Sequence, residues 1–166
     1  MNMVCREITE KDIPASADII RRAFKTVADE FSLTRENNPT HGAFIKDEKL
    51  FEDYRKDIKM FGLFEEEVQI GFAALESKDG EIFYLEKLAV LPEYRHKGGG
   101  RALMDFAVDY AREAGGKEIS IGIIYENKRL SEWYRKYGFT ETGTKIFPHL
   151  PFTVCFMKFD LNGLPC

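Results

Sequence analysis

A run of three glycines constrains the fold of this chain more than any other feature. Gly98–Gly100 lie within the cationic segment 95–101, between a strand-like segment and a helix-like one. Each glycine at a helix start costs roughly 1 kcal/mol relative to alanine, so such a run indicates a backbone that must approach something closely. The first turn of a helix offers unpaired N–H groups and a positive dipole end. With the added cations, this segment predicts a cradle for a phosphate-bearing ligand.

Two common phosphate loops do not fit this segment. The mononucleotide loop requires Gly-Lys-Ser/Thr four residues after a first glycine, and the chain contains no such string. The dinucleotide loop requires Gly-x-Gly-x-x-Gly, but Leu103 stands where the third glycine belongs. The pattern that is present is Arg95-x-x-Gly98-x-Gly100, with Val90 and Pro92 upstream.

This pattern resembles the pyrophosphate loop of the GNAT superfamily of acyl-CoA-dependent N-acetyltransferases. Two more segments stand at the family's spacing. The stretch Tyr84–Val90 resembles the central strand, and a later element resembles "Asn … Tyr-x-Lys-x-Gly-Phe" through Asn127, Leu130, Trp133, Tyr134, Tyr137, Gly138 and Phe139. The resemblance is specific from Glu81 to Phe139. It is weak over the first half of the chain, where this family usually keeps substrate recognition.

Composition narrows the class of protein. With 166 residues, a hydrophobic fraction of 44% and 14 Phe, the chain can bury one core, and we expect a single domain over residues 1–166. The net charge of -4 argues against a nucleic-acid binder. We find no membrane-spanning stretch, signal pattern or metal-ligand spacing. Cys5, Cys155 and Cys166 are far apart and form no Cys-x-x-Cys, which suits a reducing cytoplasm.

Apolar spacing predicts strands interleaved with helices, hence an α/β domain. A first helix is expected after Asp12, with Ile13, Ala17, Ile20, Phe24 and Val27 on one face, and three more at Asp47–Lys59, Arg101–Ala114 and Lys128–Tyr137. Strands are expected at Met3–Ile8, Phe61–Phe64, Val68–Glu76, Glu81–Val90, Glu118–Ile124, Phe139–Phe147 and Thr153–Leu161. The resemblance implies a GNAT-type mixed, mostly antiparallel central sheet of about seven strands flanked by about four helices.

The resemblance also implies how acetyl-CoA would bind. In this family the strands Glu81–Val90 and Glu118–Ile124 diverge, and the pantetheine arm pairs with the exposed edge at Leu88, Ala89 and Val90. The pyrophosphate would meet the backbone amides of Arg95, His96, Lys97, Gly98, Gly99, Gly100 and Arg101. Cations alone would indicate a solvated surface cluster, but beside three glycines and a helix start we favour a ligand site. Asn127 can cap the next helix, and its family counterpart often contacts the cofactor.

Glu86 is the candidate general base. An alkyl ammonium has a pKa near 10.4, so a base must remove a proton before the amine can attack. Some family members place a functional glutamate at the position of Glu86, and others two residues earlier, where this chain has Tyr84. Positions 84 and 86 share a face of the strand. The alternative for Glu86 is a charge on the solvent face, paired with Lys87 or with a cross-strand partner.

Tyr134 matches the position where many family members hold a tyrosine beside the CoA sulfur. A phenol is a weaker acid than a thiol by about 2 kcal/mol, so hydrogen bonding to the forming thiolate is the larger part of the expected effect. The alternative is a core aromatic, because Leu130, Trp133 and Tyr137 share its helical stripe. The flanking Asn127 and Gly138 favour the functional reading.

The function predicted from these residues is acetyl transfer from acetyl-CoA to a primary amine by direct attack on the thioester. No activated Cys–His or Ser–His pair suggests an acyl-enzyme. The alternative is a non-catalytic acyl-CoA-binding sensor or interaction module of the same fold. The acceptor is a small-molecule or peptide amine of unknown identity, and a homodimer is an expectation drawn from relatives. No nucleic acid, membrane or metal partner is expected.

Overall fold

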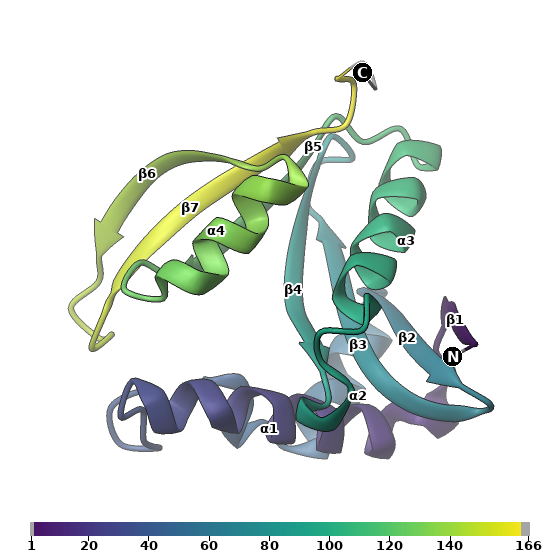
Figure 1. Cartoon of the computed structure of the whole chain (residues 1–166), viewed down its shortest axis with the longest axis horizontal. Helices are drawn as coiled ribbons and strands as arrows, with labels where there is room; N and C mark the ends of the chain where they lie inside the picture. The colour runs from purple at the N-terminus through teal and green to yellow at the C-terminus, as the bar shows by residue number, and fades with distance from the viewer. Residues whose placement is uncertain (1, 164–166) are drawn as a thin grey trace. The chain divides into compact units, whose positions relative to one another are not determined.

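The computed structural model of the chain describes residues 2–163, so Cys166 lies outside the described residues. Within that range the chain forms four α-helices and seven strands (Figure 1). The helices are α1 (Ile13–Glu30), α2 (Asp47–Arg55), α3 (Gly99–Glu113) and α4 (Lys128–Tyr137). The strands are β1 (Met3–Glu7), β2 (Lys59–Glu65), β3 (Val68–Ser77), β4 (Ile82–Val90), β5 (Glu118–Ile124), β6 (Thr140–Ile146) and β7 (Thr153–Asp160).

The seven strands form one hydrogen-bonded sheet in the order β1-β2-β3-β4-β5-β7-β6. The pairs β1–β2, β2–β3, β5–β7 and β6–β7 are antiparallel, whereas β4–β5 is parallel. A mixed, mostly antiparallel sheet with four helices confirms the predicted fold class.

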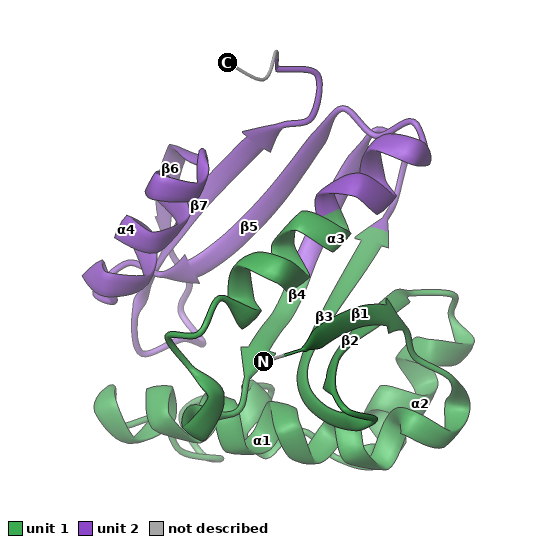
Figure 2. Ribbon diagram, turned by 45° about the vertical axis from the view of Figure 1, so that its right-hand side comes forward, with its two compact units in different colours: residues 1–76, 86–107 green, residues 77–85, 108–166 purple. Residues whose placement is uncertain are grey.

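The chain forms two compact units, coloured separately in Figure 2. Unit 1 comprises Met1–Glu76 and Glu86–Ala107. In its core, α1 buries Ile13, Ala17 and Ile20 completely, as the helical spacing predicts. Strands β2 and β3 add a fully buried set, which consists of Phe61, Leu63, Ile70 and Phe72. Strands β2 and β3 form a hairpin, and its two central turn residues, Glu66 and Glu67, both have positive φ, as the type I′ turn requires.

Unit 2 comprises Ser77–Leu85 and Val108–Cys166. Strand β5 lies between β4 and β7 in this unit, and Ile119 and Met157 are fully buried. Helix α4 begins after Asn127 and ends at Gly138, which has a φ of 131°. The prediction of one domain over residues 1–166 stays a prediction.

Three sequence expectations about local structure were wrong. The helix predicted over Asp47–Lys59 ends at Arg55, because Asp57 takes a left-handed conformation and Lys59 already pairs with Leu75 in β2. Helix α3 begins at Gly99 rather than at Arg101, so two of the three glycines form its first turn. Ala114, expected as the last residue of that helix, lies beyond its end at Glu113 and is exposed.

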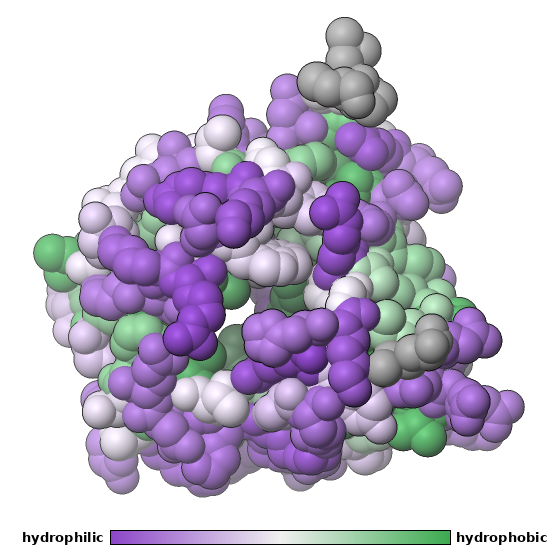
Figure 3. Space-filling model, viewed as in Figure 1, coloured by the Kyte–Doolittle hydropathy of each residue, from purple (hydrophilic) through white to green (hydrophobic). Residues whose placement is uncertain are grey.

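The surface is mostly polar on the face drawn in Figure 3. The large hydrophobic side chains that are exposed are scattered in the sequence; they are Val4, Val68, Tyr125 and Ile146. Within residues 2–163, no helix combines the length and the apolar character needed to cross a bilayer.

Candidate functional site

The glycine loop leads directly into α3. The backbone hydrogen bond from Ala102 N to Gly98 O, 3.0 Å long, is of the helical i to i−4 type, so the helical hydrogen bonding reaches back to the last residue before α3. His96 and Gly98 both have positive φ, of 63° and 87°. These two left-handed residues, separated by one position, change the direction of successive backbone N–H groups before the helix begins. Such alternation, followed by a helix start, is typical of an anion-binding backbone.

Glycine is favoured at positions 98 and 99 of this loop for different physical reasons. At Gly98 an added Cβ would meet nothing within 4 Å, so its positive φ, and not lack of space, favours glycine. At Gly99 an added Cβ would lie 2.8 Å from Leu63 Cδ2, and the residue is buried. Gly99 therefore lets the first turn of α3 lie close to β2.

The side chain of Arg95 is directed into the protein. Its Nη2 donates to Ala23 O at 2.8 Å, its Nη1 to Thr26 Oγ1 at 3.2 Å, and its Nε to Val90 O at 3.3 Å. Three of the five N–H groups of this guanidinium are thus committed to α1 and to the end of β4. Arg95 ties the loop to α1. Its contact with a phosphate stays a prediction.

A second link joins the same elements. Arg22 of α1 forms an ion pair of 2.8 Å with Glu93, which lies just before the loop. His96 and Lys97 are exposed, and Arg101 lies 3.9 Å from Asp105 on the next turn of α3. The cationic character at the mouth of the loop therefore comes from Lys97 and Arg101 more than from Arg95.

Strand β4 pairs with β5 over a short length. The parallel ladder covers Ile82–Tyr84 against Glu118–Ser120, whereas the β5–β7 ladder covers seven residue pairs. The predicted edge residues Leu88, Ala89 and Val90 lie beyond the end of the β4–β5 ladder. One of their carbonyl groups, that of Val90, accepts the hydrogen bond from Arg95. The divergence of the two strands beyond Tyr84 stays a prediction.

Glu86 is half-buried and has charged neighbours in unit 1. Burial raises the pKa of its carboxyl above the ordinary value, and the neighbouring Glu76 carboxyl adds to this rise, while Lys87 opposes it. The Nζ of Lys87 lies 3.5 Å from Glu86 Oε2. The pairing with Lys87 that the sequence left open is thus present, but the carboxyl is half-buried rather than on the solvent face, and its β3 neighbour Glu76 carries the same charge. A carboxyl with a raised pKa is also a better-matched general base near neutral pH.

Tyr134 has an apolar environment in unit 2. It is 5% exposed, and its ring makes edge contacts with Trp133 and Phe139 at centroid distances of 5.1 and 5.2 Å. Burial raises the pKa of this phenol far above its ordinary value. Complete proton transfer to a thiolate is therefore even less favourable than the roughly 2 kcal/mol between ordinary groups. The chemistry left to this hydroxyl is hydrogen bonding.

Asn127 caps α4, as predicted. Its Oδ1 accepts a hydrogen bond from Leu130 N at 3.3 Å. The cap uses the side-chain oxygen, so contact of the amide group with a cofactor stays a prediction.

The predicted site residues divide between the two units. Glu86, the edge residues 88–90 and the loop 95–101 belong to unit 1, whereas Tyr84, Asn127 and Tyr134 belong to unit 2. Within unit 1 the loop, the end of β4 and α1 are joined by the Arg95 hydrogen bonds.

The sequence analysis missed two charged residues near Glu86. Asp53 of α2 is 5% exposed, and Glu76 lies near the end of β3. Spacing could have indicated Asp53, because it stands three residues after the fully buried Leu50 on the same face of α2. Glu76 gave no comparable signal, since its contact with Glu86 depends on strand register.

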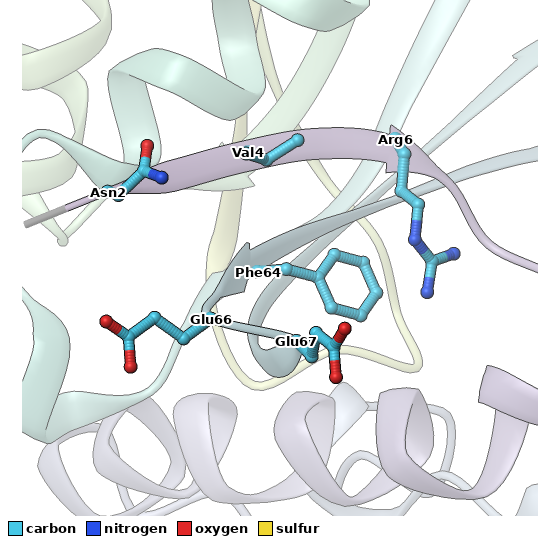
Figure 4. Close-up of a pocket in the computed structure, with 6 residues that line it drawn as sticks. All are labelled: Asn2, Val4, Arg6, Phe64, Glu66 and Glu67. Atoms are coloured by element: carbon cyan, nitrogen blue, oxygen red, sulfur yellow. The ribbon is translucent and has the colours of Figure 1, made fainter.

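A separate hollow lies at the turn between β2 and β3 (Figure 4). It is lined by Asn2, Val4, Arg6, Phe64, Glu66 and Glu67. The Arg6 guanidinium stacks on the Phe64 ring at 3.9 Å and pairs with Asp12 at 3.0 Å. None of the predicted site residues lines this hollow.

Comparison with known proteins decides the family. Residues 24–139 match the model of the Acetyltransferase (GNAT) family. The chain belongs to this family. An uncharacterized N-acetyltransferase of Escherichia coli is 30% identical over 140 residues, which cover 82% of this chain and 81% of the relative. An uncharacterized N-acetyltransferase of Mycobacterium bovis is 33% identical over 78 residues, 47% of this chain, and there the chain spans about half of the relative's length.

Solved structures support the same GNAT fold. The ribosomal-protein-S18-alanine N-acetyltransferase of Escherichia coli superposes with a TM-score of 0.78 at 18% identity, covering 99% of this chain and 97% of that one. The PaiA N-acetyltransferase of Thermoplasma acidophilum, solved with coenzyme A, gives a TM-score of 0.74 at 20% identity, covering 96% and 99%. At these identities the likeness concerns the fold.

Proposed function

We propose that this GNAT protein transfers the acetyl group of acetyl-CoA to a primary amine. The observation that carries the proposal is the backbone of residues 96–100, where two left-handed residues, His96 and Gly98, lead directly into the first turn of a helix. Membership of the acetyltransferase family agrees with it, and the PaiA relative of similar fold was solved with coenzyme A.

In the proposed binding mode, the diphosphate of acetyl-CoA lies against the amides of residues 96–101. Lys97 and Arg101 supply positive charge, while Arg95 holds the loop against α1. The pantetheine arm pairs with the edge of β4 beyond Tyr84, where the β4–β5 ladder has ended.

In the proposed reaction, the free amine attacks the carbonyl carbon of the thioester. A C–N bond forms, the C–S bond breaks, and the products are an N-acetylated amine and coenzyme A. Glu86 takes the proton that the amine loses, directly or through a water molecule, and its raised pKa brings it closer to the working pH. Tyr134 donates a hydrogen bond to the departing thiolate.

The acceptor is proposed only as a class. A small amine, an amino acid, an antibiotic, a lysine side chain or a protein N-terminus each carries the required nitrogen. The solved Escherichia coli protein of similar fold is named for the alanine of ribosomal protein S18, so a peptide carrying that alanine belongs in an acceptor panel.

Calorimetry with acetyl-CoA tests the cofactor site through one added charge. Gly98→Asp places a carboxylate in the loop, and Gly98→Asn has the same shape without the charge. Asn and Asp tolerate positive φ better than other residues do, and an added Cβ meets nothing there. We expect Gly98→Asp to bind at least 10-fold more weakly than Gly98→Asn, with a smaller difference at high salt.

The matched control is Gly80→Asp. Gly80 has a φ of 81° and equally open surroundings, but lies in the turn before β4. Its affinity for acetyl-CoA should equal that of the wild type. Equal affinities for all three variants, or no binding heat from the wild type, would overturn the proposed site.

Release of coenzyme A with the acceptor panel tests the reaction. We expect Glu86→Gln to lower kcat by about 10²- to 10⁴-fold, the usual contribution of a general base. Glu81→Gln is the control, since its carboxyl is exposed and pairs with Lys117. Full activity of Glu86→Gln would remove the base from the proposal. Tight binding of acetyl-CoA without turnover on any amine would instead indicate a non-catalytic acyl-CoA-binding module.

A further inference from the structure

Lys87 interrupts strand β4 beside the proposed base. It has a φ of 55°, a left-handed conformation that costs a non-glycine residue roughly 1–3 kcal/mol and tends to occur at functional sites. In a regular strand, neighbouring side chains point to opposite faces. Here the alternation is broken, and Lys87 Nζ comes within 3.5 Å of Glu86 Oε2.

A buried carboxylate holds Lys87 from the other side. Asp53 Oδ2 lies 3.8 Å from Lys87 Nζ, and its Oδ1 lies 2.9 Å from Lys49 Nζ. The Asp53 side chain is 6% exposed, and that of Lys87 is 22% exposed. Each oxygen of Asp53 thus faces a different ammonium group, and a buried charge is retained where it has such partners.

The charged groups facing Glu86 come from three elements of unit 1. Glu76 belongs to β3, Lys87 to β4 and Lys49 to α2, and Asp53 of α2 contacts the two lysines. Lys87 is the one that touches both Glu86 and Asp53 among these described groups. It therefore connects the buried anchor on α2 to the carboxylate on β4.

We propose that Asp53 and Lys87 are positioning residues: Asp53 anchors the ammonium group of Lys87, and Lys87 holds the Glu86 carboxylate in place for the reaction. This inference rests on the proposed role of Glu86 as base. The Lys87 cation also favours the ionised form of Glu86, which is the form that can accept a proton from the amine. Without Lys87, the Glu76 carboxyl and burial would act on Glu86 unopposed.

Carbon-13 NMR titration of the glutamate carboxyl groups tests the inference in the full chain without an acceptor. The Glu86→Gln spectrum identifies the Glu86 resonance. We expect Lys87→Met to move the Glu86 midpoint upward by about one pH unit, since an opposite charge at this range has effects of that order. Lys87→Arg keeps the positive charge, so its Glu86 midpoint should lie close to that of the wild type. Lys25→Met, which removes an exposed lysine of α1 paired with Asp29, should leave the midpoint unchanged.

A double-mutant cycle separates an anchor from a direct charge effect of Asp53. If Asp53 acts through Lys87, Asp53→Asn should shift the Glu86 midpoint in the wild type but not in the Lys87→Met background. Equal shifts in both backgrounds would overturn the anchoring role. An unmoved midpoint in Lys87→Met would overturn the inference altogether.

The pH profile of coenzyme A release links the titration to catalysis. With an acceptor from the panel, Lys87→Met should displace the acidic limb of kcat/KM to higher pH and lower kcat more than it raises KM. If Glu86→Gln keeps full activity, the proposed base is wrong, whatever the NMR shift shows. If Glu86→Gln is inactive and Lys87→Met changes neither limb nor midpoint, the positioning inference alone fails.

Discussion

The stretch Glu86–Arg101 in unit 1 and the stretch Asn127–Tyr137 in unit 2 differ in backbone conformation and in the contacts that hold them. The first has three residues with positive φ, namely Lys87, His96 and Gly98, and is held by ion pairs and arginine hydrogen bonds. The second is a regular helix with a side-chain cap and an aromatic stripe.

The same physical cause has different chemical consequences in the two stretches. Burial raises the pKa of Glu86 and of Tyr134. For a carboxyl group the raised pKa lies nearer to neutral pH. For a phenol the raised pKa makes the hydroxyl an even weaker acid at that pH. The proposed role of the first stretch therefore depends on charge, and that of the second on a hydroxyl placed by packing.

Truncation of Tyr134 should have the largest effect on stability. Tyr134→Ala removes a buried ring between Trp133 and Phe139, and such deletions cost about 3–5 kcal/mol. Glu86→Ala, at a half-buried carboxyl with a raised pKa, should cost less than about 1 kcal/mol at neutral pH. Urea unfolding measures both. Similar losses for the two variants would break the contrast between the stretches.

Removal of the Arg95 guanidinium should have the next largest effect. Arg95→Met keeps the aliphatic stem but leaves Ala23 O and Val90 O without their donor, which costs about 1–3 kcal/mol of the free energy of unfolding. Lys97→Met, in the same loop but exposed, is the control and should stay within about 0.5 kcal/mol of the wild type. If Arg95→Met weakens acetyl-CoA binding while the stability of the unliganded protein is unchanged, the side chain acts on the ligand and not on the loop.

Loss of the α4 cap should have a smaller effect. Asn127→Ala removes the acceptor for Leu130 N and should cost about 1 kcal/mol, whereas Asn127→Ser should keep most of the stability. Thermal unfolding of the two variants checks this. Equal melting temperatures for Asn127→Ala and the wild type would contradict capping.

The smallest effect is a change of stability with pH at Glu86. Because its folded-state pKa is raised, the stability that Glu86 contributes is present below the ordinary carboxyl pKa and is lost as pH rises through the raised value. Glu86→Gln lacks this titration, so its stability relative to the wild type should increase between about pH 4 and pH 7. The effect is modest because the side chain is 34% exposed. Urea midpoints at the two pH values provide the measurement, and a relative stability that falls with pH would show the opposite sign.

Much of the local structure was predictable from sequence. Alternation and helical spacing located all seven strands and four helices within a few residues, because each depends on side chains close in the chain. The end of α2 at Arg55 was missed because nothing local distinguishes Lys56–Lys59 from a further helical turn. The start of α3 at Gly99 was missed because glycine disfavours a helix by itself, and contact with Leu63 of β2 is what makes it suitable.

The sequence by itself determined the loop chemistry: a glycine at position 98, where φ is positive, cations around it, and a helix to follow. These are local requirements of the backbone. Only the tertiary structure decided which charges meet. It turned Arg95 toward α1, placed Asp53 and Glu76 around Glu86 through Lys87 and strand register, and buried Tyr134 among aromatic rings. Electrostatic environment depends on residues distant in the chain, so no local pattern encodes it.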